Sequence, residues 1–133
     1  MKRIWIAMGA VAAAGIVIGF GLGSALGQTS AIAPGVDAQV IATVEAGGEC
    51  PGMILRMRKV TFAPGASIPM HNHAERPEVT YVVSGTLTDT RKGVASVQKK
   101  AGDGVINGRE VEHMPANKSG EPVTLVSVDF VKK

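Results

Sequence analysis

Short runs of alternating hydrophobic and polar residues cover most of the chain after residue 30. The clearest run is 122–131, where residues two apart from Val123 onward share one face of an extended chain. Glycine, proline, asparagine or aspartate separates the runs, as is typical of turns. The runs predict seven strands, at 39–45, 53–62, 68–73, 78–84, 94–100, 111–115 and 122–131. No long helix fits between them, so this region is predicted to be all-β and to form a small antiparallel barrel.

An uncharged run of 23 residues, 4–26, follows Lys2 and Arg3. As a helix it would extend about 34 Å, enough to cross a bilayer, so its length favours an N-terminal hydrophobic helix that remains as a membrane anchor. A small residue on either side of Leu26 leaves a cleaved signal peptide as the alternative. In both cases the rest of the chain is expected on the periplasmic or extracellular side. The predicted organisation is 1–27 as signal anchor or signal peptide, 28–37 as linker and 38–133 as the β domain.

Glycines recur at every fourth position from Gly15 to Gly27, which repeats the GxxxG pattern of packed membrane helices. This pattern would permit a homodimer, although small residues are simply abundant in this segment. The net charge of +3 falls to +1 without Lys2 and Arg3, so the basic balance does not indicate a nucleic-acid partner. Cys50 is the single cysteine and excludes an internal disulfide framework.

Two histidines and one carboxylate are spaced as Gly65-x5-His71-x-His73-x4-Glu78-x6-Gly85. Residues two apart in a strand share a face, about 6.6 Å from each other, so both imidazoles can point at one spot. A proline turn precedes Glu78, which allows its carboxylate to return beside the histidines. Imidazole and carboxylate are metal ligands, and the stretch predicts one divalent transition metal ion as cofactor.

The third histidine, His113, lies in Gly102-Asp103-x9-His113-x3-Asn117. Alone it is equally typical of a histidine bonded to a polar neighbour. Together the two stretches resemble the two motifs of the cupin family, over roughly residues 35–133.

The resemblance implies a cupin-like jelly-roll barrel with one Fe, Mn, Ni, Cu or Zn ion bound by His71, His73, Glu78 and His113. A barrel that has lost its metal is the remaining alternative. The second motif departs from the family pattern, because Gly108 stands where proline is usual and Glu110 where glycine is usual.

Two functional hypotheses follow from this resemblance. The first is a metal-dependent small-molecule enzyme, dioxygenase-like or related, in which Glu78 acts as ligand and then as base. Glu110 is a further candidate base or partner of His113, although a solvated loop carboxylate is the favoured explanation, because loops run on surfaces. The second hypothesis is a non-catalytic metal or small-molecule binding module of the cell envelope. Few aromatic residues follow the N-terminal segment, which favours a small or aliphatic ligand.

Overall fold

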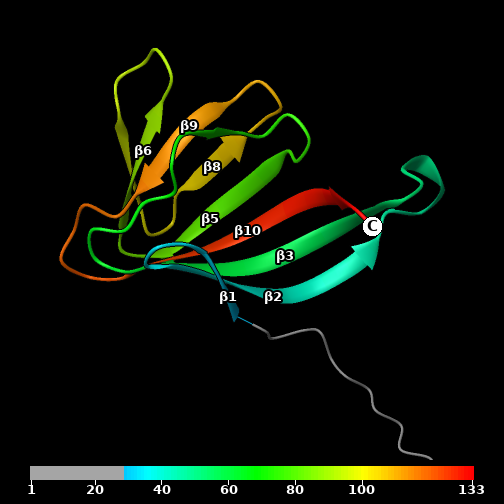
Figure 1. Cartoon of the computed structure of the whole chain (residues 1–133), viewed down its shortest axis with the longest axis horizontal. Coiled ribbons are helices and arrows are strands. Elements are labelled where there is room, and N and C mark those ends of the chain that lie inside the picture. Colours follow the sequence, from blue (N-terminus) through cyan, green and yellow to red (C-terminus); the bar gives the residue numbers. More distant parts are fainter. Residues whose placement is uncertain (1–28) are drawn as a thin grey trace, which may run out of the picture.

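The computed structural model describes residues 29–133, which form an all-β antiparallel fold (Figure 1). The hydrophobic helix expected over 4–26 lies outside these residues. A single 3₁₀ turn, η1 (Gly47–Glu49), is the one helical element in the described part of the chain, and no helix there is long and apolar enough to span a membrane. The strands are β1 (Thr29–Ala33), β2 (Val36–Glu45), β3 (Met53–Phe62), β4 (His71–Asn72), β5 (Glu78–Ser84), β6 (Thr86–Arg91), β7 (Val97–Lys100), β8 (Gly104–Asn107), β9 (Glu112–Ala116) and β10 (Val123–Lys132).

The strands form two sheets, one of six strands in the order β1-β2-β3-β10-β5-β8 and one of four in the order β4-β9-β6-β7. Every strand pair is antiparallel. The closed barrel expected from the sequence is therefore wrong, because no strand ladder in the described chain joins the two sheets. Alternating residues predict which face a strand buries, whereas closure depends on which edges pair.

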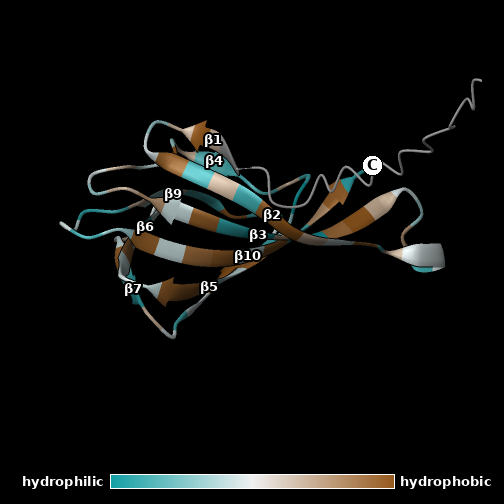
Figure 2. Ribbon diagram, turned by 90° about the horizontal axis from the view of Figure 1, so that it is seen from below, coloured by the Kyte–Doolittle hydropathy of each residue, from teal (hydrophilic) through white to brown (hydrophobic). Residues whose placement is uncertain are grey.

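The hydrophobic core follows the alternation that predicted the strands. In β10, Val123 and Leu125 are buried, while Thr124 between them is partly exposed. The register places Val123 opposite Phe62 of β3, and both side chains are buried. Figure 2 shows hydrophobic residues recurring along β10 and β5. Further along β10 the inward positions change from apolar to polar at Ser127 and Asp129, both of which are buried.

Strands β1, β6 and β8 lie outside the ranges predicted from the sequence. β1 and the start of β2 fall within 28–37, the stretch assigned above to a linker, and β1 pairs with β2. The turn from β5 to β6 contains Gly85 at φ 80°. A Cβ at Gly85 would lie 2.9 Å from the carbonyl oxygen of Pro122, so only glycine fits this tight approach.

Candidate metal centre

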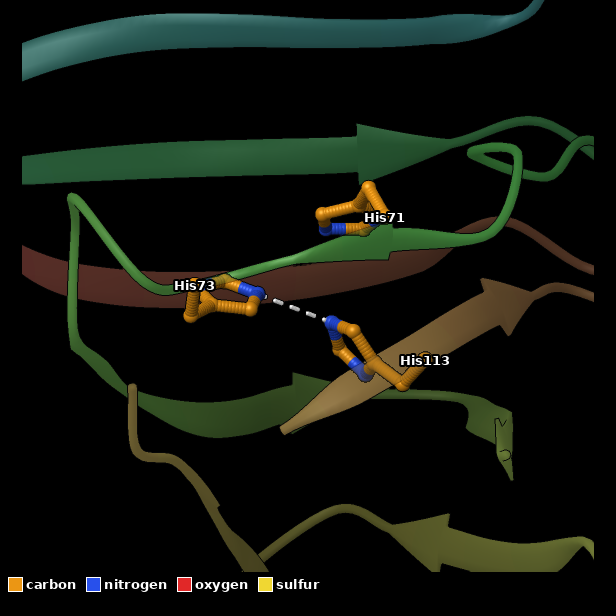
Figure 3. A group of neighbouring side chains, drawn as sticks. All are labelled: His71, His73 and His113. Carbon is orange, nitrogen blue, oxygen red and sulfur yellow. Dashed lines mark hydrogen bonds between the residues drawn. The ribbon is translucent and has the colours of Figure 1, made fainter. Parts of the chain in front are cut away.

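Strand pairing brings the three histidines of the chain to one place. β4 and β9 pair so that His71 lies directly opposite His113. His73, two residues after His71, projects from the same side of the extended chain. The ring centroids are 4.7 Å apart for His71 and His113, 5.0 Å for His73 and His113, and 5.1 Å for His71 and His73. Figure 3 shows the rings gathered between β4 and β9.

Each imidazole donates its Nδ1–H to an oxygen atom. Carbonyl and carboxylate oxygens only accept hydrogen bonds, so each Nδ1 must carry the hydrogen. The three bonds run from His71 to the Pro69 carbonyl at 2.8 Å, from His73 to the Arg76 carbonyl at 3.0 Å, and from His113 to the Asp89 carboxylate at 2.7 Å.

These bonds leave the Nε2 of each neutral ring as an unprotonated lone pair. The Nε2 atoms of His73 and His113 face each other at 3.0 Å (Figure 3). Two lone pairs at this distance repel unless a proton or a cation lies between them. One nitrogen from each of the three histidines lies within 4.8 Å of the others, so the rings converge on a volume that suits a cation.

Burial favours the neutral rings that a metal requires. It lowers the pKa of both His71 and His73. For Asp89, burial opposes ionisation, but the hydrogen bonds from His113 and Arg91 outweigh it and hold the pKa of this carboxyl below its usual value. Asp89 therefore fixes the His113 ring with Nε2 free, the arrangement found around histidine ligands of metals. Three imidazole donors suit Fe, Ni, Cu or Zn better than Mg or Ca.

Glu78 lines the same cavity as the histidines but does not join their cluster. Its Oε2 accepts from Arg58 at 2.9 Å. Its Oε1 accepts from Thr80 at 3.0 Å and from Asn107 at 3.3 Å. The structure thus brings together the three histidines, while the fourth ligand expected from the sequence is held by other partners.

A cluster of charged groups lies around Asp129, which is fully buried. Arg56 donates to both oxygens of Asp129, at 3.1 and 2.9 Å. Arg58 donates to Asp129 at 2.9 Å, and Arg76 lies 3.5 Å from the same carboxylate. Burial lowers the pKa of Arg58, although Asp129 and Glu78 oppose this shift.

The histidines open on a cavity of about 280 Å³ between the two sheets. This volume is near the lower end of small-molecule sites. Its polar wall includes Arg58, Glu78 and Asn107, and its apolar wall includes Val60, Phe62, Ile68, Leu87, Val105 and Leu125. The site therefore offers metal ligands, charged groups and an apolar surface to one small molecule.

Glu110, the further candidate, lies on the surface and does not line this cavity. Sequence reasoning missed Asp89, Arg58 and Asn107. The sequence pattern could have indicated Arg58, since this residue shares the inward face of β3 with Val60 and Phe62, and a charged residue on such a face needs partners. No sequence pattern indicated Asp89, because β6 lacks the hydrophobic alternation by which a strand is recognised.

A family model described as "Cupin domain" matches residues 58–129. A search of curated proteins returned no match. Among solved structures, KdgF from a Halomonas species is 23% identical, with a TM-score of 0.62, and the match covers 80% of this chain and 86% of that one. An RmlC-like cupin from Shewanella frigidimarina is 21% identical, with a TM-score of 0.63 and the same coverage. A predicted oxalate decarboxylase from Thermotoga maritima is 16% identical, with a TM-score of 0.60, covering 82% of this chain and 95% of that one. These likenesses show the fold, and the match of the family model over residues 58–129 establishes that the chain belongs to the cupin family.

Proposed function

We propose that the protein binds one divalent transition metal ion through His71, His73 and His113 and acts on a small molecule in the adjoining cavity. The observation that carries this proposal is the set of three Nδ1–H bonds, which turn three Nε2 lone pairs toward one another. A simple packing role for the histidines would not require all three rings to take the same tautomer.

Glu78 is the proposed fourth ligand or the base of the reaction. Its carboxylate lines the cavity beside the histidines, and three hydrogen-bond donors orient it there. A bound metal would supply a Lewis acid that polarises an oxygen of the substrate or of water. The chain's own residues would position the substrate, and the apolar wall would exclude water from it.

An enzyme of the dioxygenase-like or related metal-dependent kind is favoured over a binding module because the cavity adjoins the histidines. Metal analysis of the full chain, purified without added metal, tests the site. The wild type should contain one equivalent, whereas a His71→Ala/His73→Ala variant should contain none. A full equivalent in the double variant would refute the site, and an oxygen-consumption screen of the wild type with its native metal separates enzyme from binding module.

We further propose that residues 4–26 export the domain and remain as a membrane anchor, with the cupin domain on the periplasmic or extracellular side. The length and charge of this segment support the proposal. Cell fractionation should place the protein in the membrane. Recovery of a soluble form beginning at Gln28 would instead identify a cleaved signal peptide. Crosslinking of the membrane-bound protein tests the homodimer that the glycine pattern would permit.

A further inference from the structure

Arg58 is a buried guanidinium in the wall of the cavity that the histidines also line. The residue is 7% exposed. Its Nη2 donates to both Glu78 and Asp129. Its Nε is buried and has no acceptor among residues 29–133. Both of its hydrogen bonds to described residues come from Nη2, and none comes from Nη1. Unpaired buried donors are costly, so the described residues leave this guanidinium incompletely satisfied.

The charges around Arg58 do not balance. Three guanidinium groups, those of Arg56, Arg58 and Arg76, share the two carboxylates of Asp129 and Glu78. The cluster therefore has an excess of one positive charge. The side chains of Arg56 and Arg76 are 23% and 38% exposed, whereas that of Arg58 is only 8% exposed. Arg76 also lines the cavity, and Arg56 does not. The group best placed to complement the excess is a single negative charge in the cavity.

The other residues that line the cavity indicate the chemical character of the rest of the ligand. Val60, Phe62 and Leu125 contribute to an apolar wall that would contact hydrocarbon. Asn107, on the polar side, donates its amide nitrogen to Glu78 and has a buried carbonyl oxygen with no donor in the described chain. The volume of about 280 Å³ restricts the ligand to a small molecule.

We infer that the cavity binds a small monocarboxylate, with its carboxylate on Arg58 and its hydrocarbon part against the apolar wall. This inference deepens the proposed function, because it names the substrate class of the same site. The planar fork of a guanidinium matches a carboxylate, and the single excess charge matches a monoanion better than a phosphate dianion.

Calorimetric titration of the metal-free full chain, kept in a nonionic detergent, tests this inference. The two probes are pentanoate and pentanamide, which have the same shape and differ in charge. Pentanoate should bind at least about tenfold more tightly, because a charge-assisted hydrogen bond replaces a neutral one. Arg58→Met should abolish this preference. Arg56→Met is the matched control: it removes the same charge from the cluster, but Arg56 does not line the cavity, so this variant should keep more of the preference than Arg58→Met.

Equal binding of the two probes, no binding of either, or a preference that survives in Arg58→Met would overturn the inference. So would a preference lost equally in Arg56→Met. If circular dichroism shows that Arg58→Met is unfolded, Arg58→Lys takes its place. It keeps the charge but loses the fork, and it should weaken pentanoate binding severalfold; unchanged binding would then refute the role of Arg58. Because the titration contains no metal, its outcome is independent of whether the histidines bind one.

Discussion

Asp89 is the residue whose replacement should show how the metal centre is oriented. Its buried carboxylate accepts the Nδ1–H of His113 at 2.7 Å and the Nε–H of Arg91 at 3.0 Å. Asp89→Asn keeps the shape but removes the charge, and the amide can present its NH₂ group to His113. The imidazole would then favour the tautomer with hydrogen on Nε2, which removes the lone pair that binds metal. Loss of such a partner typically lowers metal affinity by about 10–100-fold, or about 1.4–2.8 kcal/mol.

Competition of the full chain with a chelator for Zn²⁺ or Ni²⁺ measures this affinity. Arg91→Gln is the control, because it removes the other partner of Asp89 and leaves the bond to His113 in place. We expect this control to lose less affinity than Asp89→Asn, because the hydrogen bond from His113 to the carboxylate remains. Thermal unfolding of the metal-free proteins checks that both variants fold. An Asp89→Asn protein with an affinity within twofold of wild type would refute the role given to this carboxylate.

Three further predictions concern pH, packing and the loop before His113. Burial lowers the pKa of His71 and His73, so the unfolded chain binds more protons than the folded chain below about pH 6.5. The unfolding free energy of the metal-free protein should therefore fall as the pH drops below this value. For the buried His73 the fall is at most about 1.4 kcal/mol per pH unit. Urea unfolding at pH 7.5 and 5.5 measures this, and equal or greater stability at pH 5.5 would contradict it. Val82→Ala should lower the unfolding free energy by about 2 kcal/mol in the same assay, because Val82 is fully buried. Val83→Ala should lower it by less than about 0.5 kcal/mol, because Val83 is 47% exposed. Equal losses would contradict the assigned faces of β5. Glu110→Gln should leave metal affinity unchanged, because Glu110 lies on the surface outside the cavity; a tenfold loss in the chelator assay would place it in the site.

Strand prediction succeeded where hydrophobic alternation is strong. The predicted ranges 53–62 and 78–84 coincide with β3 and β5, because both are rich in β-branched and apolar residues and are bounded by turn residues. β6 was missed, since its consecutive buried residues include the polar Thr88 and Asp89, and Asp89 pairs with His113, which is distant in sequence. The open arrangement of the two sheets could not be predicted either, because strand pairing is a property of the folded chain rather than of any one strand.

The histidines of the site were found from the sequence because a period of two places His71 and His73 on one face. The pairing of β4 with β9 then brings His113 opposite His71, and this pairing joins segments about forty residues apart. The contacts of Glu78 could not be foreseen, because they depend on Arg58, which arrives from a different strand. Glu78 as metal ligand therefore stays a prediction.

X-ray absorption spectroscopy of the metal-loaded full chain tests the central claim most directly, because it counts the imidazole rings on the metal. The account predicts three imidazole ligands in the wild type, at about 2.0–2.1 Å if the metal is zinc, and two in a His113→Ala variant. Fewer than three imidazoles in the wild type, an unchanged spectrum for His113→Ala, or a sulfur ligand from the exposed Cys50 would contradict it.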